Sequence, residues 1–177
     1  VGATVAFNAV GYPGQNVLFN LADLVTGIAD TDGDVSIATA APALALARMT
    51  RGSADAERGV RVTAETTSTI DAKIENSSLA ASFSAADDAN AVSVGAVAAM
   101  NRIASEARAE VADADLTAQA GDVTVTADDT ASIESRIVAT AISATASAKG
   151  AQSIAVAAQF TRNDVVSDVT ALVTGSD

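Results

Sequence analysis

The residues best suited to chemistry are three aspartates around a glycine, in the stretch Asp30-Thr-Asp-Gly-Asp34. Alternating carboxylates beside a tight turn present several hard oxygen ligands, which Ca²⁺ prefers. A full EF-hand loop would also need a bidentate acid where Ala41 stands, so that motif is absent. We therefore predict Asp30, Asp32 and Asp34 as a candidate Ca²⁺ site, against the alternative of an acidic turn with solvated carboxylates. No other cofactor is expected.

Catalytic groups are sparse. The chain has no Cys and no His, which excludes Ser-His and Cys-His nucleophile pairs, disulfides and thiolate zinc sites. The acid pairs Asp87-Asp88 and Asp128-Asp129 are predicted as charged turns, since neighbours on a strand point to opposite faces and make poor acid/base partners. A Ser-Lys pair through Lys73 or Lys149 is a weaker alternative to solvated charges at strand edges. We predict no catalytic residues and no enzyme activity.

The charge balance bears on partners. Twenty-two acids against ten bases give a net charge of −12, which repels nucleic acid and anionic lipid headgroups. No unbroken apolar run reaches the roughly 18 residues of a membrane span. The opening residues lack the basic region of a signal peptide and resemble the middle of a repeat, so we expect the chain to be a fragment of a longer one. Nucleic-acid partners and a membrane span are not expected.

Internal repeats organise the chain. Val60–Lys73 matches Val123–Arg136 without a gap, at an offset of 123 − 60 = 63, and Ala107–Val111 matches Val169–Val173 at 169 − 107 = 62. Val94–Asn101 matches Ile154–Thr161 at 154 − 94 = 60. The period is therefore near 62.

The first copy is longer than the others. Val1–Asn8 matches Val94–Asn101 at 94 − 1 = 93, and we assign the excess to an inserted turn or loop that includes Pro42 and Arg48 to Arg58. The predicted organisation is an irregular first repeat over 1–59, a second repeat over 60–122 and an incomplete third over 123–177, all in one continuous solenoid.

Alternation predicts strands. Val123, Val125 and Ala127 lie on one face of an extended chain, and the rhythm continues from Ile133 to Ala141. The segment 104–118 is rich in Ala, Glu and Arg and could instead form a helix. Because it aligns with the Val- and Thr-rich 166–173, and repeats share one conformation, the strand is the prediction.

The composition indicates a thin core. Apolar residues make up 49% of the chain, yet aromatic residues only 3%, so Ala and Val would have to fill the interior. We predict an all-β fold, an elongated β-solenoid (β-helix) of 62-residue repeats with roughly three coils of about 20 residues each. A compact β-sandwich is the alternative.

Particular positions are assigned within that solenoid. Asn8 and Asn101 are predicted to stack as a ladder, and Phe7, Met100 and Phe160 to share a core or corner position. Residues expected to point inward are Ala139, Ala141, Ser143, Thr145, Ser153, Ala155 and Ala157.

A family resemblance follows from these motifs. Ser153 to Ala158, Asn101 to Ile103, Ala109 to Val111 and Asp115 to Ala127 form a cycle that resembles giant bacterial β-strand-repeat surface proteins, the filamentous-haemagglutinin-like or leukotoxin-like adhesins. It covers most of residues 60–177, and the first 59 more loosely. The resemblance implies a secreted, extracellular β-solenoid at the bacterial cell surface, used as a stalk, adhesin or matrix fibre, and brings no catalytic residues.

Three functions remain open at this level. The first is a structural and adhesive module that self-associates into fibres through strand edges or with neighbouring repeats. The others are a carbohydrate-active β-helix enzyme, for which one Tyr and no Trp offer few sugar platforms, and a Ca²⁺-dependent module binding surface glycans.

Overall fold

The chain is all-β in the described residues, which are 1–12, 40–85 and 87–176 of the computed structural model. The eight strands are β1 (Gly2–Val10), β2 (Ala43–Thr50), β3 (Ser53–Ala56), β4 (Val60–Ser84), β5 (Ala89–Ala112), β6 (Asp115–Ala118), β7 (Val123–Ser147) and β8 (Ala151–Thr174). The all-β prediction is confirmed, and the four long strands have 24 or 25 residues each.

Alternation explains the long strands. In β4 the even-numbered residues are the buried or half-buried ones, and in β7 beyond Ala127 the odd-numbered ones are. Ala139, Ala141, Ser143 and Thr145 therefore point inward as predicted. The helical alternative over 104–118 is wrong, because β5 and β6 occupy that segment and its side chains pack with a period of two.

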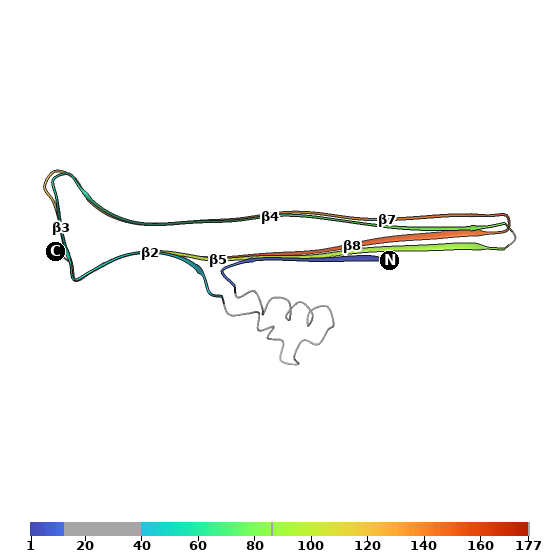
Figure 1. Cartoon of the computed structure of the whole chain (residues 1–177), viewed down its shortest axis with the longest axis horizontal. Coiled ribbons are helices and arrows are strands. Elements are labelled where there is room, and N and C mark those ends of the chain that lie inside the picture. The colour runs from blue at the N-terminus through green and yellow to red at the C-terminus, as the bar shows by residue number, and fades with distance from the viewer. Residues whose placement is uncertain (13–39, 86, 177) are drawn as a thin grey trace, which may run out of the picture. The chain divides into compact units, whose positions relative to one another are not determined.

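The strands pair in parallel at a fixed offset. β5 has β2 on one edge, with Ala43 opposite Ser105 and Thr50 opposite Ala112, which is an offset of 105 − 43 = 62. β3 pairs with β6 at the same offset, Ser53 opposite Asp115. β1 and β8 also pair with β5 (Figure 1). The predicted period of 62 is confirmed as the spacing between hydrogen-bonded strands.

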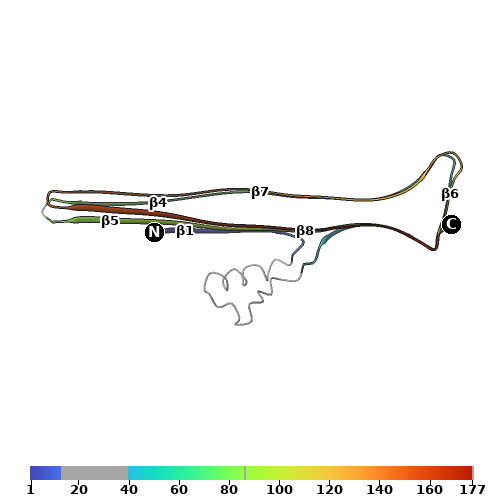
Figure 2. The same ribbon diagram turned by 180° about the vertical axis from the view of Figure 1, so that it is seen from behind.

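β4 and β7 form a separate two-stranded sheet and lie side by side in both views (Figures 1 and 2). The Thr63 hydroxyl lies 3.1 Å from that of Thr126, and the Ser132 hydroxyl 3.4 Å from that of Thr69. Both contacts join positions at an offset of 63, so the two strands run parallel. This matches the gapless similarity of the two segments.

The expectation of roughly three coils per repeat is wrong. Three coils would place hydrogen-bonded neighbours about a third of a repeat apart in sequence, whereas the observed registers place them a whole repeat apart. The alternation continues unbroken through the whole of β4 and most of β7, so one long strand occupies the length that several short ones would need.

The inserted segment also lies elsewhere than expected. Arg48 pairs with Glu110 and Ala56 with Ala118, so the charged stretch from Arg48 belongs to the regular repeat. Asn8 contacts Asn101, and Ala43 lies opposite Ser105. The chain advances 43 − 8 = 35 positions in the first copy where the second advances 105 − 101 = 4. The excess, 35 − 4 = 31, therefore falls between Asn8 and Ala43.

The described chain forms two compact units, and the long strands contribute to both. The first comprises Val1–Asn8, Asp71–Asn101 and Glu134–Asn163. Its core lies between strands of the two sheets: Ile74, Val97 and Ala99 are buried, and Ala6, Ile137 and Ala139 pack on them. Full burial of one such aliphatic side chain contributes about 2 kcal/mol.

The second unit comprises Ala9–Ile70, Arg102–Ile133 and Asp164–Asp177. Its fully buried side chains come mainly from β5, namely Ile103, Ala104, Ala107, Ala109 and Val111 at 0% exposure. A core dominated by Ala and Val confirms that small side chains fill this interior. In contrast, the β8 residues Ser153, Ala155 and Ala157 of the first unit, predicted to point inward, are exposed.

The turn before β7 requires glycine. Gly121 has φ of 153°, and a Cβ there would overlap the Arg58 carbonyl oxygen. The next residue, Asp122, accepts a backbone hydrogen bond from Val60 at 3.1 Å, which ties the starts of β4 and β7 together. Glycine thus allows two successive turns to stack closely.

In the part of the chain that the structure describes, no helix has the length and apolar character to cross a membrane.

Candidate functional site

The candidate Ca²⁺ ligands Asp30, Asp32 and Asp34 lie outside the described residues, so their prediction is not tested. Within 1–12, 40–85 and 87–176, no group of three or more His, Cys, Asp or Glu side chains is placed to hold a metal ion. The polar side chains that do converge form rows across neighbouring strands.

The most buried polar row is an asparagine ladder in the first unit. Asn8 donates from Nδ2 to Oδ1 of Asn101 at 2.8 Å, and Asn101 donates in turn to Oδ1 of Asn163 at 2.8 Å. Asn101 is completely buried and lies 3.2 Å from the Ser135 hydroxyl on β7. The predicted Asn8–Asn101 ladder is confirmed.

Asn163 extends this ladder and was not foreseen. The similarity of Val94–Asn101 to Ile154–Thr161 used an offset of 60, which set Thr161 opposite Asn101. The structural offset is 62, and 101 + 62 = 163. The same shift by two positions set Phe160 beside Met100, whereas the observed register puts Ala98 opposite it, and Phe160 is 52% exposed. The offset of 62 between the similar segments Ala107–Val111 and Val169–Val173 gave the right register.

A second polar cluster in the second unit centres on Asp129. Its Oδ2 accepts hydrogen bonds from the hydroxyls of Ser105 on β5 and Ser167 on β8, both at 2.6 Å. Asp129 therefore joins two neighbouring strands, while Asp128 is exposed. The predicted turn at Asp128-Asp129 is wrong, because both residues lie inside β7, but they do point to opposite sides.

Arg102 carries a buried charge in the same unit. Its Nε lies 3.3 Å from Oδ2 of Asp164, the acid one repeat later, without the alignment of a hydrogen bond. Its guanidinium also lies 4.5 Å from the centre of the Tyr12 ring, which is within cation–π range. Ion pairing and ring stacking make this a structural arginine.

An exposed ion pair lies farther along β5. Arg48 on β2 donates from Nη2 and Nε to Oε2 of Glu110, at 2.8 and 3.1 Å, and Nη2 of Arg108 lies 3.3 Å from the same oxygen. The Glu110 carboxylate lies between the positive charges of Arg48 and Arg108 and links β2 to β5. The three side chains support the β2–β5 register, and the Glu110 carboxylate is occupied by its contacts with two arginines.

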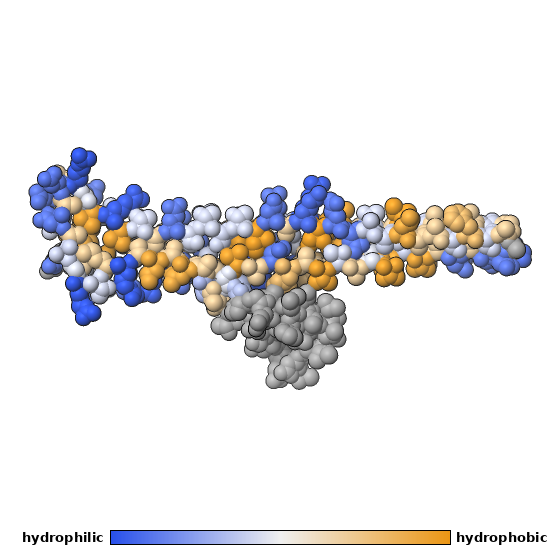
Figure 3. All heavy atoms as spheres, in the orientation of Figure 1, coloured by the Kyte–Doolittle hydropathy of each residue, from blue (hydrophilic) through white to orange (hydrophobic). Residues whose placement is uncertain are grey.

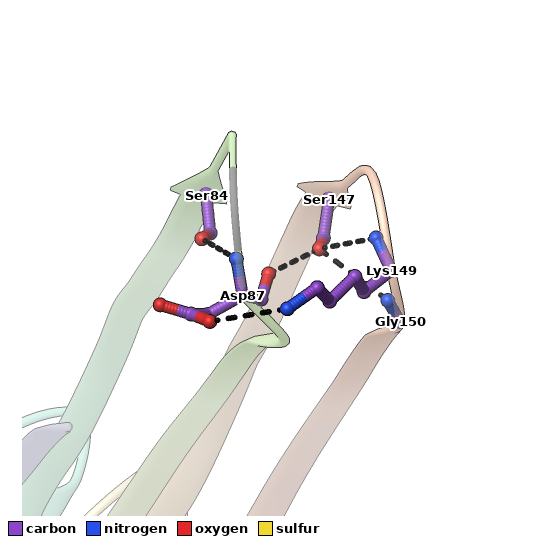
Figure 4. Close-up of polar contacts among 5 residues, drawn as sticks. All are labelled: Ser84, Asp87, Ser147, Lys149 and Gly150. Atoms are coloured by element: carbon purple, nitrogen blue, oxygen red, sulfur yellow. Dashed lines mark hydrogen bonds and ion pairs between the residues drawn. The ribbon is translucent and has the colours of Figure 1, made fainter.

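Hydroxyl groups organise the turns at the end of β4 and β7 (Figure 4). Ser84 accepts from the backbone N–H of Asp87 at 3.0 Å, while Ser147 donates to the Asp87 carbonyl oxygen. Ser147 also accepts from the backbone N–H groups of Lys149 and Gly150, at 3.2 and 3.4 Å. The Ser147 hydroxyl is therefore engaged in a structural role, and Asp87 lies in a turn as predicted.

Neither lysine forms the Ser-Lys pair considered above. Lys149 lies 3.5 Å from Oδ1 of Asp87, and Lys73 lies 2.9 Å from Oε1 of Glu75. All four side chains are more than 60% exposed. The hydrogen bond and the positive charge of Lys73 hold the pKa of Glu75 below its ordinary value. The prediction that both lysines are solvated edge charges is confirmed.

A shallow hollow of about 580 Å³ adjoins these turns and is lined by Phe83, Ser84, Ala85, Ala146 and Ser147. Its lining offers one aromatic ring and two hydroxyls, and no titratable group of the kind that acid/base chemistry requires.

Comparisons with family models, with curated proteins and with solved structures gave no match.

Proposed function

We propose that the chain is a structural segment of an elongated β-solenoid, in which each repeat adds one strand to each of two facing sheets. The observation that carries this proposal is the constant register: β2–β5 and β3–β6 are parallel, and both pair residues exactly one repeat apart in sequence. A register that repeats can be extended by adding repeats, which is how solenoids gain length.

The polar rows support the same function. Asn8, Asn101 and Asn163 stack like with like, and each amide both satisfies and orients the next. Such a row has no open position for a substrate, and it fixes the register of strands that consist largely of Ala, Val and Thr. The buried polar groups thus specify alignment.

A secreted, extracellular role as an adhesive stalk or matrix fibre of a bacterial surface is the part of the proposal that rests on the family resemblance. The acidic composition, with a net charge of −12, suits an exposed module of this kind. Hydrophobic and hydrophilic residues are interspersed on the visible face (Figure 3). Self-association and surface glycans are the proposed partners.

Duplication of one repeat tests the solenoid. A second copy of residues 60–122 inserted after Asp122 should add one strand to each sheet, lengthening the stack by about 4.8 Å without lengthening the strands. The thermal midpoint should rise because each repeat adds an interface. A scrambled insert of equal composition is the control. If small-angle X-ray scattering shows an unstructured insert in both variants, the solenoid is refuted.

Binding and turnover assays test the role. Adhesion predicts retention on bacterial or host-cell glycan surfaces, with no reducing ends released from anionic polysaccharides. Released ends that vanish on an Asp-to-Ala change would establish the enzyme instead. Glycan binding lost in chelator and in an Asp30→Ala, Asp32→Ala, Asp34→Ala variant would establish the Ca²⁺-dependent module.

A further inference from the structure

The outer face of the β4–β7 sheet becomes apolar toward the turns that end these strands. Even-numbered residues of β4 and odd-numbered residues of β7 point into the core of the first unit, so the others point outward. No charged residue lies between Glu75 and Asp87, or between Arg136 and Lys149. The outward residues nearest the ends of the strands form what we call the apolar face: Leu79, Ala81 and Phe83 on β4, and Ile142, Ala144 and Ala146 on β7.

The apolar face is open and contiguous. Leu79 and Phe83 are 74% and 77% exposed, and Ile142 is 54% exposed. The offset of 63 between the strands sets Leu79 beside Ile142 and Phe83 beside Ala146. The hollow of about 580 Å³ adjoins the second of these rows and is lined from both strands. Contiguous exposed apolar side chains of this kind mark interaction surfaces.

Stacking of repeats does not cover this face. A further repeat adds a strand beside β4 or β7 in the plane of the sheet, whereas the apolar face points away from that plane and away from the core. Its six residues all belong to the first unit. Neighbouring repeats of the same chain therefore extend the sheet and leave the face outward.

The distribution of charge allows two copies to meet here. The first unit contains five acidic and four basic residues, a net charge of 4 − 5 = −1. The second unit carries the remainder of the total of −12, which is −12 + 1 = −11. Electrostatic repulsion between copies is therefore smallest where they touch through the first unit.

We infer that two copies of this chain pack face to face through the apolar face, with their β4 strands antiparallel. A two-fold axis through the row of Ala81 and Ala144 relates the copies, since such a contact uses the same patch on both. The inference rests on the proposed function, in which the face stays outward, and it names the surface through which two stacked chains pair laterally.

The rows brought together by this axis are complementary in size. Leu79 and Phe83 lie two positions on either side of Ala81, so Leu79 of one copy meets the Phe83 ring of the other. In the same way Ile142 meets the hollow beside Ala146, which gives its side chain room. The alanines on the axis let the sheets approach to the usual spacing of about 10 Å.

The charges at the rim of the contact are also complementary. Lys73 pairs with Glu75 at one end of the apolar face, and Lys149 pairs with Asp87 at the other (Figure 4). Glu75 and Asp87 each lie six positions from Ala81, so the antiparallel arrangement brings the two ion pairs opposite each other. Each carboxylate then has an amine from its own copy and a second from its partner, and no unpaired charge is buried.

Chemical crosslinking tests the two-fold axis. Ala81→Cys places one thiol per chain on the axis row, because the chain contains no Cys. Facing residues of packed sheets lie about 10 Å apart, so a short bis-maleimide should link two copies. The control is Ser77→Cys on the same outward side, whose two copies lie about 26 Å apart along the strands. We expect at least tenfold more dimer from Ala81→Cys, and equal yields overturn the inference.

A charge introduced into the face tests the contact in solution. Phe83→Lys should weaken self-association at least tenfold in analytical ultracentrifugation, while the melting midpoint of the dilute protein stays unchanged because Phe83 is 77% exposed. Thr67→Lys, which adds the same charge to the outward side of β4 in the second unit, is the control and should leave association unchanged. Equal association of the two variants overturns the inference. Binding to neutral phosphatidylcholine vesicles that is lost in Phe83→Lys also overturns it, since a lipid surface would then be the occupant.

The repeat duplication separates this inference from the proposed function. The inserted copy of residues 60–122 brings a second set of Leu79, Ala81 and Phe83 to the sheet, so lateral association should become stronger. A lengthened stack whose association does not respond to Phe83→Lys refutes the lateral contact alone. An insert that stays unstructured refutes the solenoid.

Discussion

β5 and β8 differ in burial although they occupy equivalent places in successive repeats. Val111 on β5 is fully buried, whereas Val173, in the same row of β8, is 53% exposed. Ile103 and Val165 differ in the same way, at 0% and 48%. The residue types are alike and the register is constant, so the difference arises from neighbours: among the described strands, β5 has partners on both edges and β8 on one.

This contrast shows where the stability of a thin-cored repeat comes from. A small side chain such as Val or Ala buries little by itself, and its burial is completed by the row on each side. Identical substitutions should therefore cost more in β5 than in β8. The predictions below use that difference, in order of decreasing effect.

The largest effect is expected at the asparagine ladder. Asn101→Ala removes a buried amide that bonds Asn8, Asn163 and Ser135, leaving partners unsatisfied beside a cavity. We expect a loss of about 3 kcal/mol. Asn163→Ala, at the exposed end of the row, should cost less than about 1 kcal/mol. Denaturant unfolding of both variants makes the comparison; equal losses would mean that the position in the row does not matter.

Valine truncation tests apolar burial with the side chain held constant. Val111→Ala should lower the free energy of unfolding by about 2 kcal/mol, from lost burial and a residual cavity. Val173→Ala should change it by about 0.5 kcal/mol or less, because half of that side chain is already in water. Calorimetric midpoints provide the measurement, and a larger effect at Val173 would contradict the account given for β8.

The ion pair between β2 and β5 should contribute modestly. Arg48 is half exposed, so Arg48→Ala should cost about 0.5 kcal/mol at low salt and less as salt screens the pair. Arg48→Lys, which keeps the charge but not the forked geometry, is the control. A loss that is independent of salt would assign the effect to packing of the arginine stem.

The smallest effect concerns the exposed Lys73–Glu75 pair. The lysine lowers the pKa of Glu75, so the favourable contribution is present above the unfolded pKa of glutamate, about 4.3, and is lost as pH falls through the folded value. Lys73→Met should raise the pKa of Glu75 toward its ordinary value in an NMR titration. Lys149→Met should leave the pKa of Glu75 unchanged; a shift there would show that distant charges, and not the adjacent lysine, govern this carboxylate.

The sequence predicted strands because alternation and the internal similarity agreed between segments such as 60–73 and 123–136. It did not predict how long each strand is, because an alternating pattern does not mark the residue at which a strand ends. At the ends of β4 and β7 the chain reverses in hydroxyl-bonded turns around Asp87 and Lys149. The acid pair Asp87-Asp88 predicted the first of these turns, but not that one strand runs unbroken up to it. The predicted number of about three coils per repeat assumed coils of about 20 residues, and it was wrong.

The ladder was predictable in kind but not in extent. Asn8 and Asn101 lie in matching octets, whereas the third octet was aligned at an offset of 60, which hides the match of Asn101 with Asn163 at an offset of 62. Asp129 illustrates a further limit: its bonds to Ser105 and Ser167 link strands through the fold, and nothing adjacent in sequence signals them. Contacts across the interior depend on how β7 faces β5 and β8.

The insertion between Asn8 and Ala43 begins and ends along a single strand line, since Asn8 and Ala43 contact Asn101 and Ser105 on the same β5. Pairing resumes beyond it at the usual spacing. In the first copy, extra sequence is thus accommodated between two positions of one strand line without changing the pairing that follows. A peptide grafted between Asn8 and Ala43 should therefore leave the β2–β5 register unchanged.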